Sequence, residues 1–266
     1  MKYECTQERL PIAPWVRPHT WRMPGTQALG DQLWLDVDEA FSEQMAIRDE
    51  LIRDRLGDVH ALLDNGIEPA KECLKEVLEA LGGNSFYNIH DELVVRPDGE
   101  EISIDWGRPL KTLGRLVQED FCILQPSEYG HKLVGAVLCF PASWTLSEKI
   151  GKPMVRIHEP VSEYDAAVAQ RVQRLFDMVH PDRPMLRANA FAYDHAKLFT
   201  PKREADPPRK LVGEPRYIRS EKQVIKKLPL TGAVVFSIHT YVVPIDSLTA
   251  NQTKDLELVF KKSGIT

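Results

Sequence analysis

The sequence predicts an α+β fold. Helical periodicity dominates the first third of the chain, strands and helices mix afterwards, and no proline- or glycine-rich break divides the chain cleanly. Hydrophobic residues make up 43% and charged residues 27% of the 266 residues, values typical of globular proteins. A chain of this length can bury most of its apolar surface.

The first 38 residues combine four prolines with three tryptophans, which indicates an extended arm whose indoles dock on the body. Apolar residues at helical spacing predict helices over 39–56 and 69–81; Pro69 suits the first turn of the second helix and Gly82 its end. The turn residues 97–100 separate two expected short strands, 93–96 and 101–105.

The remaining elements are expected in the order helix, two strands, helix, strand, long loop, strand and helix. Their expected ranges are 109–118, 121–124, 133–140, 162–179 with Ser162 as its cap, 185–193, 200–216, 233–243 and about 248–261. We divide the chain into an N-terminal arm with helices, residues 1–84, and a core, residues 85–266, and expect the two to form one structural domain.

Charge and hydropathy argue against two function classes. The net charge of −5 argues against general nucleic-acid binding, which requires a basic face. The longest apolar stretch, 133–142, falls well short of the ~20 residues of a membrane helix, and the N-terminus lacks the apolar core of a signal peptide. Four widely spaced cysteines without a CxxC pair fit a reducing compartment. We therefore expect a cytoplasmic protein that binds neither nucleic acid nor membrane.

The common catalytic motifs are missing from the sequence: it contains no GxGxxG, GxxxxGK[ST], HExxH or GxSxG. Its eight histidines are scattered, and none is three or four residues from another, as a metal site on a helix would require. Residue chemistry alone therefore predicts no reaction, and a hydrolase is the least favoured class.

Three stretches are unusual. Residues 140–161 place a Trp, a Lys, a Gly and a His among prolines, which favours a rigid loop that delivers polar groups to fixed places. Residues 186–194 put an Arg and an Asn on one face of an expected strand, and 219–229 lead into a strand that ends near Tyr241.

These stretches resemble the family of the haem subunit of bacterial dimethylamine monooxygenase, long labelled a domain of unknown function. Its pattern is FP-x-x-W…EK-x-G-(K)-P-x-x-x-IH-x-PV, then R-x-NW, then R-x-ERQ-x-L-x-x-LP and a strand ending in TY. The matching residues are Phe140, Pro141, Trp144, Glu148, Lys149, Gly151, Pro153, Ile157, His158, Pro160, Val161, Arg187, Asn189, Arg219, Glu221, Gln223, Leu228, Pro229, Thr240 and Tyr241. Ala190, Lys222 and His239 depart from the pattern, where the family has Trp, Arg and often Arg; we expect them to reshape the pocket.

The resemblance implies a PAS-like antiparallel sheet with flanking helices and an N-terminal helical arm. It also implies a b-type haem, activation of O₂ at iron, and oxidative N-demethylation of a small secondary amine such as dimethylamine. Electrons would come from a separate flavin and iron–sulfur reductase, so that the chain would work in a hetero-oligomer.

The resemblance also assigns roles to residues, each with a simpler alternative. His158 would be the proximal haem ligand, or else a loop histidine bonded to backbone. Arg187, Arg219 and Lys149 would pair with haem propionates, or else form ordinary ion pairs, and Trp144 would contact the haem edge or be a core aromatic. In the distal pocket Glu221 would face the substrate, or else form a structural pair with Arg219. Asn189, Gln223 and Tyr241 would be hydrogen-bonding groups of that pocket, or else buried polar groups that satisfy the backbone.

Two non-enzymatic readings remain open at this stage. A PAS-like fold also suits a sensor that binds haem or a small ligand, and a family member without haem would be an assembly subunit. Residues 202–227 carry nine Lys or Arg against four Asp or Glu, which suits either a docking face for an acidic partner or a solvated loop.

Overall fold

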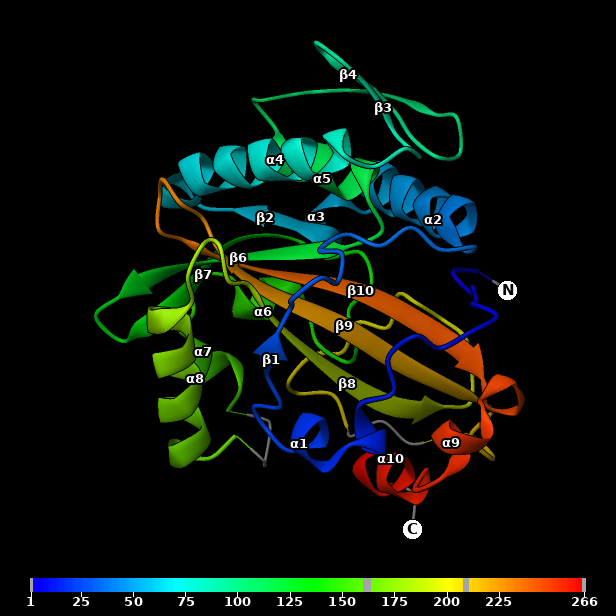
Figure 1. Cartoon of the computed structure of the whole chain (residues 1–266). Coiled ribbons are helices and arrows are strands. Elements are labelled where there is room, and N and C mark those ends of the chain that lie inside the picture. The colour runs from blue at the N-terminus through cyan, green and yellow to red at the C-terminus, as the bar shows by residue number, and fades with distance from the viewer. Residues whose placement is uncertain (1, 160–163, 208–210, 265–266) are drawn as a thin grey trace.

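The structure, a computed structural model, describes residues 2–159, 164–207 and 211–264 and is built on one seven-stranded antiparallel sheet (Figure 1). The strands lie in the order β1-β8-β9-β10-β6-β7-β2, and a separate small sheet has the order β3-β4-β5. The predicted α+β class is confirmed. Within the described residues no helix has the length and apolar character needed to cross a membrane.

The strands are β1 (Gln27–Ala28), β2 (His60–Leu62), β3 (Asn88–His90), β4 (Leu93–Val95), β5 (Glu101–Ser103), β6 (Asp120–Ser127), β7 (Gly130–Val137), β8 (Met185–Tyr193), β9 (Tyr217–Lys227) and β10 (Val234–Pro244). The α-helices are α1 (Pro18–Trp21), α2 (Phe41–Asp54), α3 (Leu56–Val59), α4 (Ile67–Gly82), α5 (Pro109–Leu116), α6 (Leu146–Lys149), α7 (Met154–Ile157), α8 (Ala166–Met178), α9 (Ala250–Thr253) and α10 (Glu257–Lys262). Three short 3₁₀ helices lie at Pro14–Val16, Asp64–Gly66 and Ile245–Ser247.

The five long strands determine the architecture. In the sheet these strands lie side by side in the order β7, β6, β10, β9 and β8. The short helices α6 and α7 and the longer α8 form the connection between β7 and β8. Helices α2 and α4 precede these strands as the helical part of the N-terminal region.

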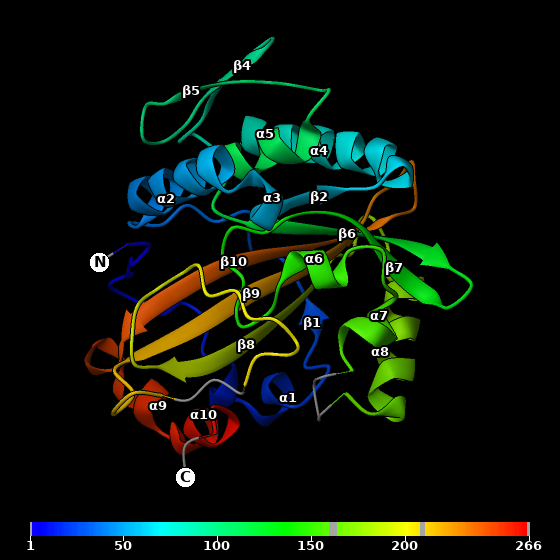
Figure 2. The ribbon, with the colours of Figure 1, turned by 180° about the vertical axis from the view of Figure 1, so that it is seen from behind.

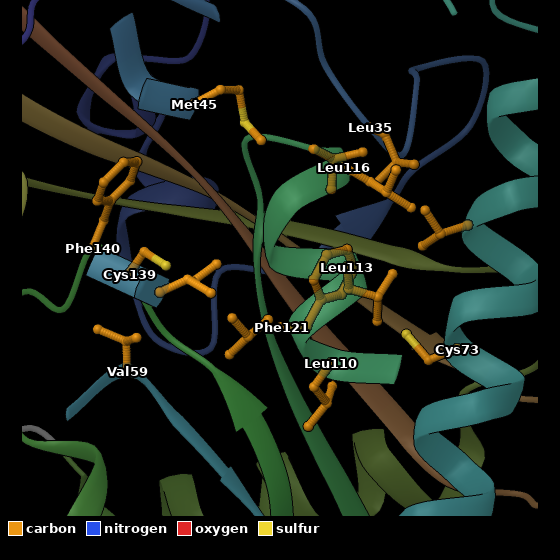
Figure 3. Close-up of a cluster of buried hydrophobic side chains, with 14 of the residues drawn as sticks. Leu35, Met45, Val59, Cys73, Leu110, Leu113, Leu116, Phe121, Cys139 and Phe140 are labelled. Carbon is orange, nitrogen blue, oxygen red and sulfur yellow. The ribbon is translucent and has the colours of Figure 1, made fainter. Parts of the chain in front are cut away.

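Helices cover the two faces of the sheet with separate apolar clusters. In β6, Phe121 and Ile123 belong to the cluster under α4 and α5, shown in Figure 3. Their neighbours Cys122 and Leu124 belong to a second cluster with α6, α7 and α8. This alternation follows from the two-residue period of a strand. The second face carries the cavity described below, and we call it the cavity face and the other one the arm face.

Helix α5 lies unusually close to the sheet at Gly114. A Cβ at this position would stand 2.6 Å from Cγ2 of Val137 and 2.8 Å from Cδ1 of Ile52, distances that a side chain cannot occupy without displacement of its neighbours. Glycine therefore lets α5 seat Leu110, Leu113 and Leu116 in the core shown in Figure 3.

Most expected elements are present, with residue shifts at their ends. The strand expected over 185–193 has those bounds, and the C-terminal helix is instead two short helices, interrupted at Asp255, whose φ of 59° is left-handed. Strands β1, β2, β3 and β9 were not among the expected elements. Helix α8 is capped by the side chain of Asp165, which accepts from the backbone N–H of Val168; the expected cap Ser162 lies outside the described residues.

Trp15 and Trp34 of the first 38 residues dock on the arm face, as their indoles predicted, whereas Met23, Pro24 and Thr26 line the cavity. The ring N–H of Trp15, 2% exposed, donates to the carbonyl of Gln252 at 2.8 Å, and that of Trp34 donates to the hydroxyl of Ser237 at 2.9 Å. Both indoles thus have a partner for their one polar group.

A buried charge network joins this arm to strand β10. Both ring nitrogens of His239 contact carboxylates, Glu119 at 2.9 Å and Asp38 at 3.1 Å. Burial alone would lower the pKa of His239, but the two carboxylates outweigh it and raise the pKa to about 10. On the neighbouring strand Lys222 donates to both oxygens of Asp36 at 2.8 Å, and the hydroxyl of Tyr241 donates to the same carboxylate. The imidazolium therefore holds two acids that burial would otherwise penalise.

We expect His239→Ala to lower the free energy of unfolding by about 3–5 kcal/mol near neutral pH, because it leaves Glu119 and Asp38 buried without their cation. The folded pKa lies above the ordinary value of 6.5, so this contribution is complete below pH 6.5 and declines as the pH rises towards 10. Urea unfolding of both proteins between pH 6 and 9.5 measures it, with the exposed His19→Ala as control. A difference that stays constant across this range would contradict the assigned charge.

Candidate functional site

A cavity of about 380 Å³ lies between the sheet and helices α6, α7 and α8. Strands β6, β8, β9 and β10 supply one wall. The loop before α6 and residues 202–204 also line the cavity, and because Arg203 and Glu204 are solvent-exposed we call this side the mouth. Much of the lining is apolar, including Leu124, Leu133, Val172, Phe176, Ile225 and Phe236. A mostly apolar cavity with a few placed polar groups is typical of a small-molecule or cofactor site.

His158 lies in this lining, directly after helix α7. Its Nδ1 is 3.0 Å from the carbonyl oxygen of Met154, and its ring stacks on Tyr164 with centroids 4.4 Å apart. Burial lowers the pKa of His158, with Arg187 and Lys149 acting in the same direction, so the ring is neutral at pH 7. A carbonyl can only accept, so Nδ1 carries the proton and Nε2 keeps its lone pair. Such an imidazole has the tautomer and fixed orientation of a metal ligand.

Three polar side chains of the opposite wall share one carboxylate. Asn189 pairs directly with Glu221 across the strands, so the two side chains and Gln223 share the cavity face. One oxygen of Glu221, Oε2, accepts from the amide of Asn189 at 2.9 Å and from that of Gln223 at 3.0 Å. The other, Oε1, accepts from Nε of Arg219 at 3.3 Å and Nη2 at 3.2 Å.

This arrangement determines which way both amides face. An ionised carboxylate only accepts hydrogen bonds, so Asn189 and Gln223 must turn their NH₂ groups towards Glu221. Their carbonyl oxygens, Oδ1 and Oε1, are consequently directed elsewhere; both are buried, and neither has a hydrogen-bond partner among the described residues. The wall therefore carries two unused acceptors.

Lys149 was expected at a haem propionate, but the structure gives it two internal partners. Its ammonium, 4% exposed, donates to the carbonyl oxygen of Ile157 at 2.8 Å and to the carboxylate of Glu204 at 2.6 Å. Arg156 also donates to Glu204, at 2.9 Å. Hydrogen bonds from Lys149 and Arg156 lower the pKa of Glu204 to about 2, so the carboxylate is ionised throughout the physiological range. The ammonium of Lys149 is thus already neutralised.

Glu204 belongs to a segment that we call the strap, residues 200–206, which follows β8 on the cavity face (Figure 2). Thr200 forms a bridge with Ala142, and the backbone N–H of Glu204 donates to Glu148 at 2.9 Å. Since these partners lie in or beside the cavity lining, the strap is held across the cavity mouth.

The structure brings seven of the nine expected site residues to this cavity: Trp144, Lys149, His158, Arg187, Asn189, Glu221 and Gln223. Arg219 stands behind Glu221 and also donates to the carbonyls of Leu198 and Phe140, so it forms the structural pair that was the alternative. Tyr241 is not brought to the site, because its side chain lies on the arm face and donates to Asp36.

The three departures from the family pattern also lie away from the cavity. In the strand register Lys222 pairs with His239 and with Ala188, and Ala190 pairs with Ser220, so all these side chains share the arm face. The expectation that Ala190, Lys222 and His239 reshape the pocket is therefore wrong.

The segment 202–227 does not form one basic face either. From Tyr217 onwards it is the central strand β9, where Lys222 pairs with Asp36 and Lys226 with Glu76 at 3.0 Å. Residues 208–210 lie outside the described chain. Both the docking face and the solvated loop are therefore excluded for the strand part of this segment.

Two residues of the site were not predicted from the sequence. Tyr164, which stacks on His158, falls within the expected helix 162–179; its place only six residues after the histidine was the one indication that it lies near the imidazole. Glu204 lies in a charged loop and has no local signal, because its partner Lys149 is 55 residues away in the sequence.

Comparison with known families gives one match over nearly the whole chain. Residues 25–261 match the family described as haem-dependent oxidative N-demethylase, alpha subunit-like. The matched range contains the strap, the whole seven-stranded sheet and all of the cavity lining except Met23, Pro24 and Lys262.

We expect Glu204→Gln to weaken the attachment of the strap, since it removes the charge that Lys149 and Arg156 share. Cys122 lines the cavity and reports on access to it, so its alkylation by iodoacetamide should become about threefold to tenfold faster. Mass spectrometry measures the rate, with buried Cys73 as internal reference and the exposed Glu214→Gln as control variant. An unchanged rate at Cys122 would show that the ion pairs do not hold the mouth closed.

Proposed function

The chain belongs to the haem-dependent oxidative N-demethylase, alpha subunit-like family, and we propose that its cavity binds a b-type haem and carries out oxidative N-demethylation of a small secondary amine. The observation that carries the proposal is His158, a neutral imidazole on the cavity wall whose Nδ1 is engaged by Met154. Nε2 is then the atom offered to iron.

The wider donor set fits haem better than a bare metal ion. Among the described residues no group of three or more His, Cys, Asp or Glu side chains could hold a metal ion. Haem brings four nitrogen ligands of its own, so one protein imidazole suffices. The apolar lining from β6, β10 and α8 suits the faces of a macrocycle, and Trp144 lies in the same lining.

Cations for the haem propionates are also present. Arg187 lines the cavity; its Nε donates to the carbonyl of Pro24 at 3.1 Å, and burial lowers its pKa, opposed by Glu221. An anion beside Arg187 would relieve the cost of burying its charge. Lys202 and Arg203 of the strap lie at the same cavity. We assign these three residues to the propionates in place of Lys149 and Arg219.

The amine is assigned to the wall formed by Asn189, Glu221 and Gln223. When bound, haem supplies the activation of O₂; each demethylation takes up two electrons and two protons and releases formaldehyde and water. The residues of this chain bind and orient the amine and exclude water. Glu221 keeps both amides fixed, because its two oxygens accept from Asn189, Gln223 and Arg219 at once.

Each demethylation takes up two electrons, which an electron-transfer partner would supply; the sequence contains neither a CxxC pair nor a GxGxxG motif. We propose a flavin and iron–sulfur reductase in a cytoplasmic hetero-oligomer. The words "alpha subunit-like" in the family description support an assembly of several subunits.

We expect protein produced with added haem precursor to show a Soret band, and His158→Ala to shift or abolish it, because the variant loses the axial nitrogen. Visible absorption spectra measure this, with the exposed His180→Ala as control. Reconstituted native protein without a Soret band would overturn the proposal. A Soret band without O₂ consumption in the presence of dimethylamine and a chemical or enzymatic reductant would instead favour the sensor.

A further inference from the structure

We propose that the carbonyl oxygens of Asn189 and Gln223 form a two-acceptor site that selects the substrate by its number of N–H donors. The preferred ligand is a dialkylammonium ion, which has two N–H bonds on one nitrogen. This inference rests on the proposed function and deepens it, since it names the residues that determine specificity and the charge state of the amine that binds.

The first support is the pair of unused acceptors itself. Side chains that line a cavity seldom keep a buried oxygen without a donor, because such an oxygen has lost its water and gained nothing in return. Here two such oxygens belong to residues of one cavity wall, both attached to the same carboxylate oxygen of Glu221. Their common support indicates that one ligand satisfies both.

The second support is that the wall cannot rearrange to satisfy itself. Turning either amide over would set its carbonyl against the carboxylate of Glu221, and two acceptors repel. Glu221 cannot turn away either, since Arg219 holds Oε1 and is itself fixed by the carbonyl of Leu198 at 2.9 Å. The missing donors must therefore come from outside these side chains.

The third support is the charge of the wall. Arg219 balances Glu221, so the carboxylate has no place for a further ion pair, and it acts as a positioning residue rather than a base. Its charge nevertheless polarises both amides, which makes their oxygens stronger acceptors for a cationic donor. Ile238 pairs directly with Gln223 in the sheet and also lines the cavity, so alkyl groups on the nitrogen meet an apolar surface.

The test is a titration of haem-loaded protein with dimethylammonium, trimethylammonium and tetramethylammonium, which offer two, one and no N–H donors. Calorimetry gives the three affinities, and the Soret band reports the loading of haem. We expect affinity to fall about tenfold for each donor lost. Equal affinities for the three cations in native protein would overturn the proposal without any variant.

Gln223→Leu and Asn189→Leu, tested separately, each remove one acceptor. We expect either variant to weaken dimethylammonium binding about tenfold and to leave trimethylammonium little changed, so that the preference between the two cations shrinks. Gln125→Leu, at a β6 position outside the cavity wall, is the matched control and should keep the native preference. A parallel loss for all three cations would mean that water or Arg187 satisfies the oxygens, and the proposal would fail.

The two proposals fail separately. Protein that never shows a Soret band removes the haem function, yet the same calorimetric order among the three cations would still support the two-acceptor site. Protein with a normal Soret band and no preference among the cations leaves the haem function intact and overturns the site.

Discussion

Strand β9 crosses the middle of the sheet with polar side chains on both faces. Between Arg219 and Gln223 five consecutive residues are at most 6% exposed, although all five are polar or charged. Strands β8 and β10 flank these five residues on both sides, so their backbone is hydrogen-bonded, but each side chain must find its partner above or below the sheet. Unpaired charges in such a place would destabilise the fold severely, and the elements packed on the two faces have to supply the partners.

The two faces meet this requirement in different ways. On the cavity face, Arg219 and Glu221 pair with each other and with two amides, which leaves acceptors for a ligand. On the arm face, Lys222 finds Asp36 in the N-terminal arm, and His239 of the next strand finds Asp38 in the same arm. The alternation of side-chain direction along β9 thus places the cavity on one face and the attachment of the arm on the other.

This division gives a physical account of the differences from the family pattern. Ala190, Lys222 and His239 all face the arm. Lys222 and His239 still carry the positive charges that Asp36 and Asp38 require. Ala190 has no bulk of its own, but the cluster around it contains the indole of Trp15 from the arm. The changes therefore concern how the arm is held, and the cavity residues of the pattern are unchanged.

Features that depend on local side-chain periodicity could be predicted from the sequence. The bounds of β8, the helical face of α4 and the shared face of Arg187 and Asn189 all followed from periods of 2 or 3.6 residues. The structure places Tyr241 on the arm face instead of in the cavity. Its face depends on the register between β9 and β10, which no local pattern encodes. The ion pair of Lys149 could not be predicted, because the sequence shows the cation but not that the distant Glu204 neutralises it. Positions on a strand were predictable; pairings across the fold were not.

Lys149 also links parts of the site that its sequence neighbours do not connect. One of its hydrogen bonds holds the carbonyl of Ile157, the residue before His158, and the other holds the strap at Glu204. His158 is further restrained by Met154 on its own helix and by the ring of Tyr164. The imidazole is thus fixed from three directions, and one of these includes the segment that closes the cavity. Because the imidazole is held in place beforehand, no conformational entropy has to be lost when its Nε2 binds. The position of the strap also affects the position of His158, because Lys149 binds both the strap and the residue before His158.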